Sequence, residues 1–388
     1  MSRWNAYLKT GIKIIETYDG RNPLSAWLKD FFRQHKQMGS RDRKIISGFV
    51  YSSYRLGHST FNLSTENKIL CGLFICNYNF NELLSCIKPE WNQHIHLPLE
   101  EKESYLISEG LQWRQGAIFP WQEDLSEGID KSLFNVCHII QPDLFLRIRP
   151  QQEMIVNKKL NDAGISFTRF TDHCIALPNA TSLDKVLNID KEVVIQDYSS
   201  QRIGDFFKLN NIAGSVWDCC AGSGGKSIMA YDINPQIKLS VSDSRPSIIQ
   251  NLVQRFRIAG IKNYHSFVQD LTDAENTPPA TQIDHIIADV PCTGSGTWSR
   301  TPEQLFFFDH KKIKYYSDLQ KNIISTVVPK LNDNGWLIYI TCSVFKNENE
   351  AVVEFIKVNL GLKLVAMELL KGYEMKADSM FVAVLRKG

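Results

Sequence analysis

The feature that most constrains the fold is a repeated alternation of strand, turn and helix, which begins at about residue 191. Five short apolar runs are typical of buried strands: "GSVWDCC", "IKLSVSD", "HSFVQD", "DHIIADVP" and "GWLIYITCS". Helical stretches such as "RPSIIQNLVQRFRIAG" separate them, and two more strand-like runs, "KLVAMEL" and "MFVAVLRK", close the chain. The alternation predicts an α/β fold with a doubly wound, mostly parallel seven-stranded sheet that helices cover on both faces.

The chain before residue 191 shows two other patterns. Up to about residue 130, runs such as "LSAWLKDFFRQH" and "DRKIISGFVYSSYRLG" carry apolar residues at helical spacing, with Ser40 and Asp42 as candidate caps. A strand-like "DLFLRIRP", an amphipathic helix and a strand-like "CIALP" then indicate a small α+β module. The sequence therefore predicts three domains: residues 1–130 helical, 131–190 α+β and 191–388 α/β.

The composition excludes several classes of protein. With 43% hydrophobic and 22% charged residues, the chain of 388 residues is ordinary for a soluble protein. It has neither the apolar run of a signal peptide nor a stretch of roughly 18 apolar residues that would span a membrane. The nine cysteines form no CxxC pair and no Cys/His cluster that would suggest zinc. We therefore expect a cytoplasmic protein with reduced thiols and no metal, which does not contact a membrane.

Charge is distributed unevenly along the chain, although the net charge is only +2. Residues 1–60 contain eleven Lys and Arg against four Asp and Glu, whereas residues 61–130 contain four against eleven. The basic segment could contact nucleic acid. A solvated helix face would explain the same charge equally well, so charge alone leaves both interpretations open.

A glycine-rich turn follows the first strand of the α/β region. In "VWDCCAGSGGKS", the residues Gly222, Gly224 and Gly225 precede a helix, and glycines there let a ligand approach the backbone and the helix N-terminus. The nucleotide phosphate loop requires a glycine at position 220, where this chain has cysteine. The dinucleotide pattern GxGxxG is not met either, because Lys226 and Ser227 follow the third glycine.

Acidic residues end the strands on either side of this turn. Asp218 ends the first strand, and Asp243, Asp270 and Asp289 end the next three. Ligands of open α/β sheets bind beyond the carboxyl ends of the strands, and an acid after the second strand is well placed for ribose hydroxyls. We expect adenosine with a cationic or neutral tail, because the pyrophosphate of a dinucleotide would meet carboxylates.

Two cysteines, Cys292 and Cys342, follow the fourth and fifth strands. Either could be a buried apolar residue, as we expect of Cys219 and Cys220. However, neighbouring strands would bring both thiols to the same crevice. A thiolate can attack carbon 6 of a pyrimidine ring, which makes carbon 5 electron-rich enough to take a methyl group from a sulfonium donor.

These stretches together resemble a known family, the RNA (cytosine-5) methyltransferases of the Sun/Fmu type, which include bacterial 16S ribosomal RNA enzymes. The resemblance rests on "QDYSSQ", "DCCAGSGGKS", "DVPCTGSGTWSRTPE", "YITCSVFKNENE" and "DSMFVAVLRK". It implies a Rossmann-like methyltransferase domain, an antitermination-factor-like helical domain and an RNA-binding α+β module. It also implies S-adenosyl-L-methionine as cofactor and RNA as partner, with ribosomal RNA the expected substrate, and we expect a monomer.

The resemblance also implies roles for individual residues. Cys342 would be the nucleophile, Cys292 would assist release of the methylated base, and Asp289 would hydrogen-bond the cytosine edge. Lys226 would orient Asp289 or the cytosine, and Asp289 also belongs to the expected cofactor site. The other expected cofactor-binding residues are Cys220, Ala221, Gly222, Ser223, Gly224, Gly225 and Lys226 around the methionine part, Asp243 at the ribose and Asp270 near the adenine.

The sequence departs from the family at a few positions and leaves alternatives open. Ser223 stands where many members have proline, and Arg149 replaces a common asparagine, which puts the choice of target in doubt. DNA cytosine methyltransferases use the cysteine of a Pro-Cys pair as nucleophile and rely on a Glu-Asn-Val motif that this chain lacks. A tRNA cytosine-5 methyltransferase and a non-catalytic RNA-binding assembly factor stay open as alternatives.

Overall fold

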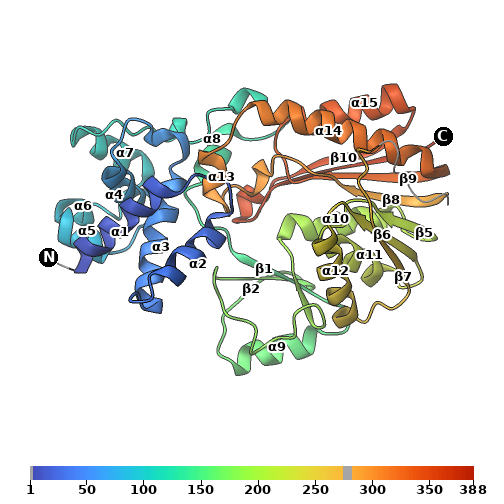
Figure 1. Cartoon of the computed structure of the whole chain (residues 1–388), viewed down its shortest axis with the longest axis horizontal. Coiled ribbons are helices and arrows are strands. Elements are labelled where there is room, and N and C mark those ends of the chain that lie inside the picture. The colour runs from blue at the N-terminus through green and yellow to red at the C-terminus, as the bar shows by residue number, and fades with distance from the viewer. Residues whose placement is uncertain (1–2, 274–281) are drawn as a thin grey trace. The chain divides into compact units, whose positions relative to one another are not determined.

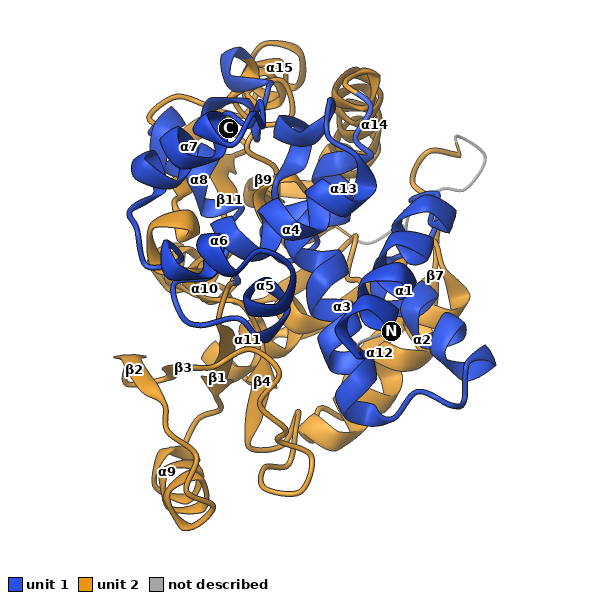
Figure 2. Ribbon diagram, turned by 90° about the vertical axis from the view of Figure 1, so that its left-hand side faces the viewer, with its two compact units in different colours: residues 1–123, 130–141, 298–309 blue, residues 124–129, 142–297, 310–388 orange. Residues whose placement is uncertain are grey.

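The computed structural model describes residues 3–273 and 282–388 and divides into two compact units (Figure 2). Residues 1–123, 130–141 and 298–309 form one, which we call the helical unit. Residues 124–129, 142–297 and 310–388 form the other, which we call the sheet unit. Residues 298–309 thus belong to the helical unit although they lie, in sequence, inside the α/β region. The division into three domains at residues 130 and 190 stays a prediction.

The helical unit buries one face of each of its first helices in a common core. Apolar residues at helical spacing, including Ile14, Leu28, Phe32 and Val50, form this buried cluster. Its helices are α1 Arg3–Thr17, α2 Leu24–Gln34, α3 Ser40–Arg55, η1 Gly57–Thr60, α4 Thr65–Ile75, α5 Glu82–Ile87, α6 Pro89–Gln93, α7 Leu99–Ser108, η2 Gln115–Ala117, α8 Lys131–Cys137 and α13 Pro302–Phe306, with η3 Gln122–Asp124 at its boundary.

Carboxylate side chains accept backbone N–H groups at the starts of α2 and α3. The Asp42 carboxylate accepts the N–H of Gly39, the N-cap of α3, whereas Ser40 is already the first helical residue. Of the two candidate caps, only Asp42 therefore acts on the helix start. The late helix α13 is fastened in the same way, since its Glu303 accepts the N–H of Leu24 at the start of α2 over 3.2 Å.

The sheet unit contains the seven-stranded sheet that the alternation predicts (Figure 1). Its strands are β5 Ser215–Asp218, β6 Lys238–Asp243, β7 Tyr264–Val268, β8 Ile283–Asp289, β9 Leu331–Thr341, β10 Lys363–Leu370 and β11 Met380–Arg386. They lie in the order β10-β11-β9-β8-β5-β6-β7. The five strands from β9 to β7 run parallel, and β11 pairs antiparallel with both β9 and β10. The predicted mostly parallel sheet is therefore confirmed.

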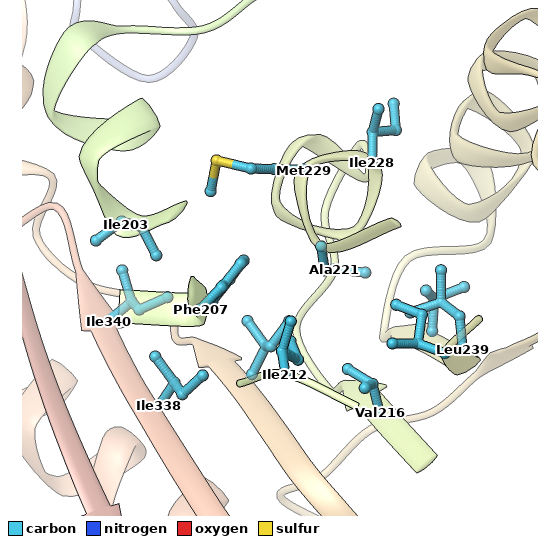
Figure 3. Packing of buried hydrophobic residues seen from close by; sticks show 14 of the residues in the cluster. Ile203, Phe207, Ile212, Val216, Ala221, Ile228, Met229, Leu239, Ile338 and Ile340 are labelled. Carbon is cyan, nitrogen blue, oxygen red and sulfur yellow. The ribbon is translucent and has the colours of Figure 1, made fainter. Parts of the chain in front are cut away.

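Helices cover both faces of this sheet, as a doubly wound fold requires. They are α10 Tyr198–Leu209, α11 Gly225–Ile233, α12 Pro246–Ala259, α14 Lys311–Val327 and α15 Glu350–Leu360, with short turns η4 Ser295–Thr297, η5 Val328–Lys330 and η6 Gly372–Met375. Ile338 and Ile340 of β9 pack with α10–α12 (Figure 3), whereas Leu337 and Tyr339 pack with α14 and α15. Successive side chains of a strand point to opposite faces, so both faces are apolar.

A smaller antiparallel sheet precedes the large one within the sheet unit. Its strands are β1 Leu144–Ile148, β2 Thr168–Thr171, β3 Cys174–Leu177 and β4 Val193–Ile195, in the order β2-β3-β1-β4, and the helix α9 Glu153–Asp162 accompanies them. Val156 and Leu160 of α9 pack against Leu146 and Ile175 of the sheet. Among the described helices, none is long and apolar enough to cross a bilayer.

Candidate active site

A cavity of about 740 Å³ lies at the carboxyl ends of the parallel strands of the sheet unit. Eleven of the twelve predicted site residues line it: Cys220, Ala221, Gly222, Ser223, Gly225, Lys226, Asp243, Asp270, Asp289, Cys292 and Cys342. Its volume lies within the range of small-molecule sites, roughly 300–1,000 Å³. The parallel order of the strands gathers these residues, because each of them lies in or near a strand end.

The glycine turn leaves its backbone open to the cavity. Gly222 has a φ of 52° in the left-handed region, and a Cβ added at Gly222 or Gly225 would meet no atom within 4 Å. Gly224, the twelfth predicted residue, does not line the cavity. Its φ is 84°, and a Cβ there would lie 2.8 Å from the ring of Phe256, so packing against α12 requires this glycine.

The carboxylates of Asp243 and Asp270, near the ends of their strands, accept hydrogen bonds from nearby donors. Arg245 donates through Nε and Nη2 to the two oxygens of Asp243, at 2.8 and 3.0 Å, and the N–H of Gly222 donates over 3.1 Å. Burial opposes ionisation of Asp243, but these hydrogen bonds outweigh it and lower its pKa. The hydrogen bonds from the hydroxyl and N–H of Thr272 likewise lower the pKa of Asp270, two residues beyond β7.

The two predicted thiols meet in the cavity. Cys342 directly follows β9 and Cys292 lies three residues beyond β8, the parallel neighbour of β9. Their Sγ atoms are 3.2 Å apart. The hydrogen bond with Cys342, followed by burial, raises the pKa of Cys292 well above its usual range. Two sulfurs this close cannot both carry a negative charge without strong repulsion, so the pair holds at least one proton at neutral pH.

Lys226 joins the glycine turn to the end of β8. Its Nζ lies 3.1 Å from Oδ2 of Asp289 and donates to the hydroxyl of Ser200 over 2.8 Å. The lysine side chain is only 9% exposed, whereas that of Asp289 is 29% exposed and faces the cavity. The ion pair fixes the direction of the carboxylate at the cavity wall.

Some residues of the site were missed from the sequence. Ser200, the partner of Lys226, lies in "QDYSSQ", so that motif did carry a signal. Arg255 of α12 donates to the carbonyl and hydroxyl oxygens of Ser223 and makes a two-pronged ion pair with Asp190. No local pattern marks Arg255, because its partners lie 32 and 65 residues away in the chain.

Known proteins similar to this chain include methyltransferases of ribosomal RNA. Residues 208–384 match the family model described as 16S rRNA methyltransferase RsmB/F. The probable ribosomal RNA small subunit methyltransferase B of Coxiella burnetii is 25% identical over 235 residues, 58% of this chain and 52% of its own length. The chain spans about half the length of the curated relatives it matches.

Solved structures agree in fold. The crystal structure of PH0851 has a TM-score of 0.70 at 16% identity and covers 99% of this chain and 98% of its own. NSun6 from Pyrococcus horikoshii, solved with SFG, has a TM-score of 0.56 at 15% identity and covers 64% and 91%. The resemblance inferred from the motifs is thus confirmed as a similarity: residues 208–384 are similar to the 16S rRNA methyltransferase RsmB/F model, and the fold is that of solved methyltransferase structures.

Proposed function

We propose that the protein is an S-adenosyl-L-methionine-dependent RNA methyltransferase that forms 5-methylcytosine in ribosomal RNA. The observation that carries the proposal is the 3.2 Å approach of Cys292 and Cys342 in the cavity that the glycine turn also lines. The family match over residues 208–384 and the ribosomal RNA methyltransferases among its relatives support the substrate class.

The cavity suits the expected cofactor. S-adenosyl-L-methionine, when bound, supplies an electrophilic methyl group. The open backbone at Gly222 and Gly225 would accommodate its methionine part, and the ionised Asp243 would accept hydrogen bonds from ribose hydroxyls. Asp270, which also lines the cavity, would take the adenine amine. The P. horikoshii NSun6 structure contains SFG, an analogue of S-adenosyl-L-methionine, which supports the assignment.

The thiols would act in sequence on the cytosine. The Cys342 thiolate would form a bond to carbon 6, and the ring electrons would move to carbon 5. Carbon 5 would then take the methyl group as the bond from that methyl to the sulfonium sulfur breaks, its electron pair staying on sulfur as a neutral thioether leaves. A base then removes the hydrogen of carbon 5, that electron pair restores the ring double bond, and the bond from carbon 6 to sulfur breaks to release Cys342.

Cys292 would assist this last step. Its pKa is high chiefly because it shares a hydrogen bond with Cys342. When Cys342 is bound to carbon 6 as a neutral thioether, that hydrogen bond and the repulsion between two thiolates are gone, and Cys292 ionises more readily. Cys292 can then take up the proton from carbon 5, directly or through water. Asp289, held by Lys226, would receive the cytosine edge.

The target base must leave its stack to reach the thiols, which costs a few kcal/mol and least for an unpaired base. The helical unit offers groups that would contact RNA. Trp4, Arg41, Lys44 and Phe80 line a hollow of about 520 Å³, together with Glu82. Cationic and aromatic side chains side by side suit backbone phosphates and unpaired bases.

The decisive experiment measures methyl transfer from labelled S-adenosyl-L-methionine to RNA by the wild type and by Cys342→Ala. We expect the variant to lose transfer below detection, because it lacks the thiol that would form the bond to carbon 6, while calorimetry finds cofactor binding unchanged. Undiminished turnover in Cys342→Ala would contradict the nucleophile assignment.

The substrate is tested by bisulfite sequencing of total RNA from cells with and without the gene. We expect a methylated cytosine in ribosomal RNA that disappears with the gene. A change confined to tRNA would overturn the substrate, and no change in any RNA would favour a non-catalytic RNA-binding protein.

A further inference from the structure

A fully buried carboxylate lies behind the two thiols. Glu348, in the loop between β9 and α15, is 0% exposed and accepts hydrogen bonds at both oxygens. Its Oε1 accepts the hydroxyls of Thr293 and Ser343, at 2.6 and 2.7 Å. Its Oε2 accepts the N–H of Thr293 at 2.8 Å and the side-chain amide of Gln320 at 3.1 Å.

Two of the residues that donate hydrogen bonds to Glu348 lie next to the two cysteines in the sequence. Thr293 directly follows Cys292, and Ser343 directly follows Cys342, so one carboxylate binds the residue next to each thiol. Gln320, on α14, also donates to the carbonyl of Pro291, which directly precedes Cys292. The donors thus come from both cysteine loops and from α14, not from the helix α15 that begins two residues after Glu348.

Weaker contacts between the same loops surround this carboxylate. The hydroxyls of Thr293 and Ser295 lie 3.3 and 3.2 Å from that of Ser343, and the N–H of Gly296 donates to the carbonyl of Cys342. Hydroxyls can rotate to serve as donor or acceptor, but a carboxylate only accepts, so it fixes the direction of every donor around it. Burial raises the pKa of Glu348, and the hydrogen bonds from Ser343 and Thr293 act against that.

We propose that Glu348 is a positioning residue that holds the Cys292 and Cys342 loops together and so sets the approach of the two thiols. Its effect on methylation rests on the proposed function, whereas its effect on the thiol geometry does not. Glu350 provides the matched control. It lies two residues further on and accepts from Ser126 and Glu127 rather than from either cysteine loop.

The geometry is tested with phenylarsine oxide, whose arsenic bonds two neighbouring thiols and releases water without any change of oxidation state at sulfur. Mass spectrometry assigns the bridged product to Cys292 and Cys342. In Glu348→Gln the amide brings an N–H₂ donor against donors that already point at it, so the loops separate. We expect about a tenfold weaker bridge at this pair because preorganisation is lost, and no change in Glu350→Gln.

Ser343→Ala removes a single donor and serves as the milder variant in case Glu348→Gln fails to fold; we expect an intermediate loss. Bridging in both variants that equals the wild type would overturn the proposal, even if their melting temperatures fall.

The catalytic arm compares kcat and KM for methyl transfer. Because Glu348 does not line the cofactor cavity, we expect kcat of Glu348→Gln to fall about tenfold or more with KM for S-adenosyl-L-methionine unchanged. A weaker arsenical bridge in a protein whose wild type transfers no methyl group would support the positioning role and reject the proposed function. Unchanged kcat with a weakened bridge would overturn the catalytic part of the inference.

Discussion

Two clusters of side chains in this protein each contain a cysteine thiol in a short polar contact, but only one of them lines a cavity that a substrate could enter. In the sheet unit, Cys292 and Cys342 lie 3.2 Å apart and line a cavity. In the helical unit, the thiol of Cys137 lies 3.3 Å from the hydroxyl of Ser299 and 3.8 Å from the ring of His138, and all three residues are buried. Judged by residue type alone, a thiol beside a hydroxyl and an imidazole would suggest a catalytic site. A short contact from sulfur therefore indicates chemistry only where a substrate can reach the thiol.

The helical-unit cluster has a structural explanation instead. The buried guanidinium of Arg55 donates to the carbonyls of His138, Ile140 and Ser299, which come from distant parts of the chain. It joins α3, the end of α8 and residues 298–309 within one core. A buried cation that satisfies several carbonyls stabilises the packing of these segments. The stretch "DVPCTGSGTWSRTPE" therefore serves the cavity with its first half and the helical core with its second.

The largest expected effect is a difference between alanine variants of the two clusters, Cys292→Ala and Cys137→Ala. On the proposed mechanism, the Cys342 adduct should still form in Cys292→Ala but should not be resolved, so the protein should accumulate as a covalent complex with RNA. A denaturing gel would show a slow-migrating band that ribonuclease removes. Cys137→Ala should show no band and turnover within about twofold of wild type, because its thiol is buried away from any substrate. If Cys292→Ala gives no band, its release role is wrong.

The sequence predicted most of what positions the cavity. Seven strands, their helices and the adjacent ends of β8 and β9 followed from alternation, because topology rules leave few arrangements for such a pattern. Two features did not follow. Residues 298–309 join the helical unit through Glu303, Phe306 and Phe307, whose apolar and capping contacts lie more than 200 residues away in sequence. The packing role of Gly224 was hidden because a functional motif contains it.

The second prediction concerns pH and the sheet unit. Asp218 is fully buried at the end of β5, its Oδ1 has no hydrogen-bond partner among the described residues, and burial raises its pKa to about 7. Between its ordinary value near 3.8 and 7, the folded state holds a proton that the unfolded state has released. The stabilisation is therefore complete below about pH 4 and lost as pH rises through 7, about 4 kcal/mol in all.

Hydrogen exchange followed by mass spectrometry, corrected for the intrinsic effect of pH, reports this unit separately. Peptides of β5 and β6 should lose protection in the wild type as pH rises from 4 to 7, and should lose much less in Asp218→Asn. An equal loss in the variant would show that another group titrates.

The smallest expected effect has the opposite sign and belongs to the helical unit. His138 is buried, its Nε2 has no hydrogen-bond partner within the described part of the chain, and burial lowers its pKa to about 4. Between 4 and its ordinary 6.5 the unfolded state binds the extra proton, so the stabilisation is complete above about pH 6.5 and lost as pH falls through 4, about 3 kcal/mol.

His138→Asn, which does not titrate, should abolish this loss in peptides of α8. Acid should thus loosen the surroundings of His138 in the helical unit over the range in which it stabilises the surroundings of Asp218 in the sheet unit, because His138 is a buried base and Asp218 a buried acid. Parallel pH responses of the two sets of peptides would contradict that assignment.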